Sequence, residues 1–162
     1  MTTEPVAPET RHAWHIVLNA GQEARRRGDR RIGTEHLLLA LLEDPVIAGI
    51  LGVDIARARH TLASLDREAL GALGVGPLID APPLAMRAVP RTPRLRDVAH
   101  RDRLHLTPAA KKLLEEAARH NRRRLQVTGR QVLTSMLALP PQDPAMVLLR
   151  ALGVNPLEVA LP

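Results

Sequence analysis

The chain has 162 residues, which is enough for one domain of ordinary size or two very small ones. Hydrophobic residues make up 45% of it and are almost all aliphatic, because there is one Trp and no Phe or Tyr. The lack of Cys excludes disulfides, zinc–thiolate sites and thiol nucleophiles. The net charge of +6, carried almost entirely by Arg, is compatible with an acidic partner such as nucleic acid.

The first nine residues, MTTEPVAPE, are rich in Pro and Thr and predict a flexible N-terminus. They have neither the basic start nor the apolar stretch of a signal peptide. No apolar run approaches the roughly 20 residues that a membrane-spanning helix needs. We therefore expect a cytoplasmic protein without a membrane anchor.

The first half of the chain predicts four helices. Thr10 is the expected N-cap of the first. Apolar residues from Ala13 to Ala24 recur there at spacings of three and four, and Gly28-Asp29 ends the helix. Three more helices follow, at residues 35–43, 45–51 and 54–70, with Asp44-Pro45 separating the first two and Asp54 capping the third.

The second half predicts a similar series of helices. Thr107 is the expected N-cap of a helix with Pro108 at its first position, which is a strong start signal. Three further elements are expected, a helix at residues 129–139, a short helix from Asp143-Pro144 to Leu152 and a last short helix at Asn155-Pro156. The stretch between the two halves holds many Gly, Pro and Arg residues without periodicity and predicts a linker.

The two halves also resemble each other residue by residue. Residues 32–38 (IGTEHLL) align with residues 127–133 (VTGRQVL), and the Leu-Gly-Val turn at 51–53 recurs at 152–154. A recurring order of elements indicates a duplicated unit. Each four-helix unit has too little core to be stable alone, so we expect the two to pack together.

The sequence therefore predicts an all-α fold of two tandem four-helix repeats that form one domain with pseudo-twofold symmetry. The expected divisions are a flexible N-terminus (1–9), the first repeat (10–70), a linker (71–104) and the second repeat (105–162).

Several stretches resemble the Clp N-terminal repeat, the double four-helix domain at the front of Clp/Hsp100 unfoldase ATPases, especially of the ClpC type. They are IGTEHLLLALL, LTPAAKKLLEEA and the paired LGV turns, and the resemblance covers about residues 9–70 and 105–160. The second repeat departs where the family usually repeats Gly-Thr-Glu-His. The phosphate-binding pattern GxxxxGK[ST] of an ATPase is absent. The resemblance thus implies a stand-alone N-domain without ATP hydrolysis.

The pair Glu35-His36 has a catalytic and a structural interpretation. A catalytic role would make Glu35 a base or His36 a metal ligand, but the zinc motif HExxH needs a second His one turn away, which is missing. In the structural interpretation Thr34 caps the helix, Glu35 faces the positive end of its dipole and His36 packs in the interior. We favour the structural interpretation and expect no catalytic residue, no metal and no cofactor.

The resemblance gives Glu35 a further role. In ClpC-type N-domains the Glu of this motif and the Thr that opens the first helix are implicated in binding phosphoarginine on tagged substrates. The resemblance implies a pocket of Thr10 and Glu35, in which the carboxylate accepts from the guanidinium. In the second repeat Thr107 is retained but Arg130 replaces the Glu, so that pocket is expected to be lost or altered.

Basic and histidine residues provide the remaining candidates. His12 and His15 are spaced to share a metal ion, but surface histidines are the simpler interpretation. Two Arg clusters at equivalent helix ends form a candidate basic patch: Arg25, Arg26, Arg27, Arg30 and Arg31, with Arg122, Arg123 and Arg124. Cations at these helix ends complement the helix dipole, which is a sufficient structural explanation. Nucleic-acid binding is the alternative, but the chain lacks the aromatic residues that usually stack on bases.

The expected function is non-catalytic recognition of proteins or peptides in bacterial Clp-type proteolysis. The chain would act as an adaptor, a degron-binding protein or a competitor of a Clp ATPase N-domain, with a peptide docked in the groove between the repeats. The expected partners are Clp ATPase or protease components, adaptors and substrate peptides, and the chain is expected to be a monomer. The alternative is a basic regulator that binds nucleic acid through the Arg clusters.

Overall fold

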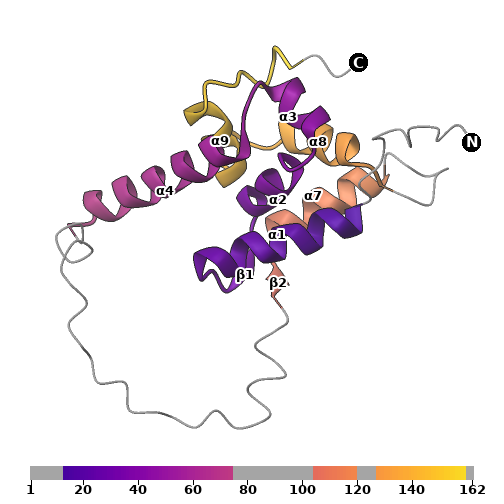
Figure 1. Ribbon diagram of the computed structural model, residues 1–162. Coiled ribbons are helices and arrows are strands. Elements are labelled where there is room, and N and C mark those ends of the chain that lie inside the picture. Colours follow the sequence, from indigo (N-terminus) through magenta and orange to yellow (C-terminus); the bar gives the residue numbers. More distant parts are fainter. Residues whose placement is uncertain (1–12, 75–103, 120–126, 160–162) are drawn as a thin grey trace, which may run out of the picture.

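The structure of the protein is a computed structural model, which describes residues 13–74, 104–119 and 127–159. Within these ranges the chain forms seven α-helices and two strands of two residues each. The elements are α1 (Ala13–Arg27), β1 (Arg31–Ile32), α2 (Thr34–Leu41), α3 (Pro45–Leu51), α4 (Ile55–Ala72), β2 (His105–Leu106), α7 (Pro108–Arg119), α8 (Gly129–Leu137) and α9 (Pro144–Ala151) (Figure 1). The prediction of an all-α fold is confirmed.

Helix α2 lies at the centre of the bundle. It packs against α1 and α4 from the first half of the chain and against α7, α8 and α9 from the second. Its sequence TEHLLLAL explains this position, because a helix that is apolar all round is stable only when other elements surround it. Every residue of α2 is buried except Glu35, which keeps partial exposure.

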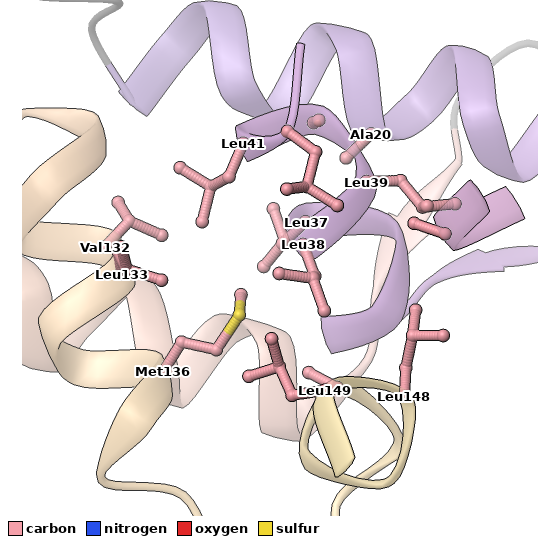
Figure 2. Close-up of a cluster of buried hydrophobic side chains, with 14 of the residues drawn as sticks. Ala20, Leu37, Leu38, Leu39, Leu41, Val132, Leu133, Met136, Leu148 and Leu149 are labelled. Carbon is pink, nitrogen blue, oxygen red and sulfur yellow. The ribbon is translucent and has the colours of Figure 1, made fainter. Parts of the chain in front are cut away.

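The two halves share one aliphatic core. Figure 2 shows the leucines of α2 together with Val132, Leu133 and Met136 of α8 and with Leu148 and Leu149 of α9. The side chains of these five partners are fully buried, at 0% exposure. Each such side chain contributes about 1.5–3 kcal/mol when it leaves water, and much of that area is covered by the other half. The halves therefore depend on each other for their stability.

A short parallel pairing also joins the halves. Arg31 pairs with His105 and Ile32 with Leu106, and the N–H of Thr107 donates to the carbonyl of Ile32 at 2.9 Å. Sequence periodicity does not reveal strands of two residues, so this pairing was not predicted. Its consequence is that the start of α7 lies beside the start of α2.

A second backbone bond crosses between the halves in the opposite direction. The N–H of Ala13, the first residue of α1, donates to the carbonyl of Val127 at 2.8 Å. Val127 precedes α8 as Ile32 precedes α2. The first helix of each half therefore begins beside the second helix of the other half, in agreement with the expected pseudo-twofold arrangement.

The predicted helix starts in both halves are confirmed by the side chains that cap them. Asp44, Asp54 and Asp143 each accept a hydrogen bond from the backbone N–H two residues later, at 2.9–3.0 Å. Thr107 Oγ1 accepts from the N–H of Ala110 at 3.2 Å. These caps satisfy N–H groups that a helix cannot pair internally.

One predicted cap is wrong. The N-cap of α2 is Gly33, and Thr34 is the first residue of the helix. The hydroxyl of Thr34 instead donates to Asp143 Oδ1 at 2.6 Å. The inference from sequence failed because a Thr in front of a leucine run fits both the N-cap and the first position of the helix. Its partner, Asp143, comes from the second half of the chain, which no local pattern reveals.

Several predicted boundaries also change. Helix α2 ends at Leu41 and α8 at Leu137, two residues earlier than predicted in each case, while α4 continues to Ala72. The expected last short helix is a turn, in which the side chain of Asn155 accepts from the N–H of Leu157 at 3.2 Å. The expected start of the first helix and most of the expected linker, residues 75–103, lie outside the described residues.

Candidate functional site

Glu35 occupies the second position of α2, close to the positive end of the helix dipole. Its side chain is 19% exposed, and its Oε1 atom lies 3.2 Å from Nδ1 of His36. Among the residues that the structure describes, no Arg or Lys side chain forms an ion pair with Glu35. Among these residues the carboxylate is thus partly accessible to an added cation and is not paired with a permanently charged side chain.

His36 lies directly beneath this carboxylate, and its side chain is only 1% exposed. The backbone N–H of Gly33 donates to its Nδ1 at 2.9 Å, and its Nε2 lies 2.9 Å from Asp29 Oδ2. An N–H can only donate, so Nδ1 accepts, and in the neutral ring the proton is on Nε2 and is donated to Asp29. The prediction that His36 packs in the interior with local hydrogen bonds agrees with this geometry.

Thr107 is the expected site residue that the structure brings close to Glu35. Its N–H is bonded to the carbonyl of Ile32, three residues before Glu35, and its hydroxyl caps α7. Thr10, the partner that the resemblance suggested for Glu35, lies outside the described residues. The pairing across the repeats therefore places Thr107, from the second repeat, at the segment that leads into Glu35.

Arg130 occupies the second position of α8, as Glu35 does in α2. It is half-buried, and its carbonyl accepts from the hydroxyl of Thr134 at 2.9 Å. The bond between Ala13 and Val127 places the start of α1, and not α7, beside this segment. Thr107 and Arg130 are consequently at different junctions between the repeats: Thr107 lies beside the start of α2, and Arg130 is in the helix that starts beside α1.

The starts of α2 and α8 share one kind of hydrogen bond, from the N–H of the N-cap residue to the side chain three residues later, but the accepting side chains differ. In α8 the N–H of Thr128 donates to Oε1 of Gln131 at 2.9 Å, as the N–H of Gly33 donates to His36 in α2. Residues three positions apart bond in this way in a capping box. Gln131 and His36 are structural equivalents, and only the histidine can change its charge.

Asp29 connects His36 to an ion-pair network on the surface. Arg27 Nε donates to Asp29 Oδ2 at 2.9 Å, and its NH2 group lies 2.6 Å from Asp66 Oδ2 on α4. Burial alone would raise the pKa of Asp29, but hydrogen bonds from Arg27 and His36 outweigh it and hold that pKa below its ordinary value. A hollow of about 470 Å³ beside this network is lined by Arg27, Asp29, Asp66, Ala69 and Leu70.

The same network changes the expected basic patch. Burial would lower the pKa of Arg27, but its bonds to Asp29 and Asp66 raise it, so this guanidinium holds α1 to α4. Arg25, Arg26, Arg30 and Arg31 remain exposed around the end of α1. Arg122, Arg123 and Arg124 lie outside the described residues, so the structure does not bring the two clusters together.

Two further observations concern metals and membranes. Across 13–74, 104–119 and 127–159, no three His, Asp or Glu side chains are grouped closely enough to hold a metal ion. His12 lies outside these ranges, so the alternative of a metal ion shared by His12 and His15 is not tested. In the same ranges no helix combines the length and apolar character needed to cross a bilayer.

A family model described as the Clp repeat (R) N-terminal domain matches residues 9–152, which is most of the chain. The chain belongs to the Clp repeat N-terminal domain family. The match covers the first predicted repeat and the second as far as Leu152, and it confirms the family inferred from the sequence. A comparison with curated proteins gave no match.

Membership associates this Clp repeat domain with Clp-type ATPases and proteolysis, and with Clp-family components as partners at that coarse level. Two residues at the site of this Clp repeat domain were missed from sequence. Asp29 was interpreted only as part of a helix stop, and Gly33 only as part of a motif. Asp29 and Gly33 precede His36 by seven and three residues, and neither their types nor this spacing distinguishes an ordinary loop residue from a hydrogen-bond partner.

Proposed function

We propose that this Clp repeat domain is a non-catalytic module that binds proteins or peptides in Clp-type proteolysis. The proposed site is the junction of the α2 and α7 starts, where Glu35 accepts a hydrogen-bonded guanidinium. The single observation that supports it is the partly exposed carboxylate of Glu35, which has no Arg or Lys partner among the described residues and follows Ile32, the residue bonded to Thr107, by three positions.

Phosphoarginine is the ligand that we propose for this junction. A carboxylate and a guanidinium form charge-assisted hydrogen bonds, which are about twice as strong as neutral ones. A phosphate is favoured where helix N-termini present positive dipole ends, and α2 and α7 begin side by side here. The hydroxyl of Thr107 could donate to that phosphate, because its oxygen uses only a lone pair in capping Ala110.

A binding role fits this site better than catalysis. A general base needs an accessible nitrogen or oxygen within hydrogen-bond reach of its substrate. Both ring nitrogens of His36 are occupied by Gly33 and Asp29, and the ring is 1% exposed. The carboxylate of Glu35 remains accessible, which supports recognition of a cation, and the described residues at this junction supply no accessible base to pair with it.

The proposed role in the cell is to recruit or compete. By binding a tagged substrate, an adaptor or a degron, the domain would deliver it to a Clp ATPase or withhold it from one. A monomer with a single acidic site is sufficient for either role. The two roles have opposite effects on the degradation rate of a bound substrate, because delivery raises that rate and competition lowers it.

The test is an NMR titration of the chain with free phosphoarginine. Shift changes are expected at the amides of Gly33–His36 and Thr107, and Glu35→Gln should abolish them. Glu68→Gln, on the exposed end of α4, is the matched control and should bind as the wild type does. Unchanged amides at the α2 and α7 starts, with the wild type at saturating ligand, would exclude this site.

A second measurement tests the association with Clp components. Purified Clp ATPase is captured on the immobilised chain, with Glu35→Gln and Glu68→Gln as test and control. Retention by the control and loss by Glu35→Gln would support a shared site. Equal retention by both variants would separate Clp binding from Glu35.

A further inference from the structure

One nitrogen of His36 contacts two groups that require opposite protonation states. Nδ1 accepts from the N–H of Gly33 at 2.9 Å, and it also lies 3.2 Å from the carboxylate oxygen Oε1 of Glu35. The first contact needs a lone pair on Nδ1, and the second becomes a hydrogen bond only when Nδ1 carries a proton. The neutral ring therefore leaves the Glu35 carboxylate without a bond from His36.

We infer that His36 is a pH-dependent positioning residue for Glu35. Protonation of Nδ1 creates a hydrogen bond from the imidazolium to Oε1 of Glu35, and the same carboxylate is then less available to a cationic ligand. The site accordingly binds a guanidinium when His36 is neutral and releases it when His36 is charged. This inference rests on the proposed function, because it describes the regulation of the same site.

The position of the carboxylate depends on Gly33. A Cβ atom at Gly33 would lie 2.3 Å from both carboxylate oxygens of Glu35, so the carboxylate is folded back over the glycine. This folded conformation brings Oε1 to the ring of His36. An extended Glu35 side chain would reach outward and lose that contact, so Gly33 and His36 together determine where the acceptor lies.

Other charged groups face the ring but keep their roles in both states. Asp29, in the loop after α1, accepts from Nε2 whether the ring is neutral or charged. Arg27 of α1 and Asp66 of α4 reach the ring only through Asp29. The change on protonation is thus confined to Nδ1 and its two partners.

Asp143, the N-cap of α9, is another acidic group that the structure places at this end of α2. It binds the hydroxyl of Thr34, the residue between Gly33 and Glu35. That bond holds the first turn of α2 in place from the side of the second repeat. Asp143 accepts from Ala145 as well, so its carboxylate has partners of its own in either state of His36.

The second repeat shows which substitution isolates the effect. Gln131 accepts from the N–H of Thr128 at the position equivalent to His36, with the same 2.9 Å distance. His36→Gln should therefore keep the backbone bond to Gly33 while removing the titratable group. Glu35→Gln is the companion variant, which keeps His36 and removes the charge of its partner.

The experiment measures binding of freshly dissolved phosphoarginine at pH 8 and pH 6. Wild-type affinity is expected to fall about fivefold or more at the lower pH, which is the range of a typical coupling between sites. His36→Gln should bind at pH 8, and its affinity should fall less than about twofold at pH 6, because the ring that gains the proton is gone. Any effect of the ligand's own protonation is the same for both proteins and cancels in the comparison. An equal fall in the two proteins would overturn the inference.

A measurement without ligand separates this inference from the proposed function. The ring nitrogens of His36 and the carboxyl carbon of Glu35 are followed by NMR across the same pH range. A joint change in the wild type, with no carboxyl change in His36→Gln, supports the coupling even if phosphoarginine never binds. A ring that titrates while the Glu35 carboxyl carbon stays constant would overturn it, whatever the ligand does.

Discussion

Thr34 and Asp143 form a buried hydrogen bond of 2.6 Å although they lie 109 positions apart in the sequence. Thr34 is 1% exposed and Asp143 is 7% exposed. The bond joins the first residue of the central helix α2 to the N-cap of α9, so it links the two repeats at the level of the proposed site. The equivalent position at the start of α8 is Gly129, which has no hydroxyl and so cannot form the same bond.

Thr34→Val should therefore destabilise the whole domain. The valine keeps the shape of the side chain but removes the hydroxyl donor, so Asp143 Oδ1 keeps only the bond from the N–H of Ala145. Losing a hydrogen bond to a charged group costs about 1.5–3 kcal/mol. The matched control is Thr134→Val, because that exposed hydroxyl bonds only to a carbonyl within its own helix and should change stability by about 0.5 kcal/mol or less. Urea unfolding measures both, and equal effects would contradict a special role for the Thr34 bond.

Glu23 and Arg59 make a second connection within the first repeat. The carboxylate of Glu23 is 2% exposed and receives two hydrogen bonds from Arg59, at 2.6 and 3.0 Å. Arg59→Met should cost at least about 2 kcal/mol, because it leaves a buried charge without its main partner. The measurement is chemical unfolding at neutral pH.

A double variant tests the cause of that loss. Glu23→Met together with Arg59→Met removes both charges and should recover much of the stability, because an apolar pair needs no compensation. Arg67→Met, on the exposed side of α4, is the control for losing an arginine and should be nearly neutral. A double variant less stable than Arg59→Met alone would show that packing, and not the buried charge, determines the cost.

The depressed pKa of Asp29 predicts how stability depends on pH. Its folded pKa lies below the ordinary aspartate value of about 3.9, so the folded state binds protons less readily than the unfolded chain. The stabilisation is present above the unfolded pKa and is lost as the pH falls through the folded pKa. Asp29→Asn should thus lower stability at pH 7 and should approach the wild type in acid. Glu68→Gln serves as the control, and a constant difference between wild type and Asp29→Asn at every pH would refute the linkage.

Much of the fold could be predicted because its signals are local. Asp54 and Asp143 have side chains that cap helices, Gly52 adopts the left-handed φ of 62° that ends α3, and the leucine run of α2 required a position inside the bundle. Each of these depends on residues within one or two helical turns. A single sequence contains that information, which is why the helices that the structure describes were expected in the right order, although the last expected short helix is a turn.

The candidate site was predicted less well because its contacts cross between repeats. Glu35 was identified from the motif, but its neighbour Thr107 depends on a two-residue strand pairing that has no periodicity. Thr34 was taken for a cap because its partner, Asp143, lies in the other repeat. Only the packing of α2 against α7 and α9 determines these relationships, and no spacing within one repeat reveals them.

Gly33→Ala tests whether the position of the Glu35 carboxylate, and not only its charge, matters for binding. The backbone at Gly33 has φ −94° and ψ 179°, which any residue adopts, so the fold should lose about 1 kcal/mol or less. The new Cβ would lie 2.3 Å from the carboxylate oxygens and must displace them, since the end of a flexible side chain moves more easily than backbone. Phosphoarginine binding, measured by NMR titration, should weaken by roughly tenfold.

The matched control for Gly33→Ala is Gly49→Ala. Gly49 lies inside α3, and a Cβ there meets nothing within 4 Å. That substitution should raise stability by up to about 1 kcal/mol, because Ala favours a helix interior over Gly, and binding should not change. If Gly33→Ala binds as tightly as Gly49→Ala, the carboxylate does not act from its folded position over Gly33. The contact between Glu35 and His36 would then have no part in recognition, because that contact exists only in the folded position.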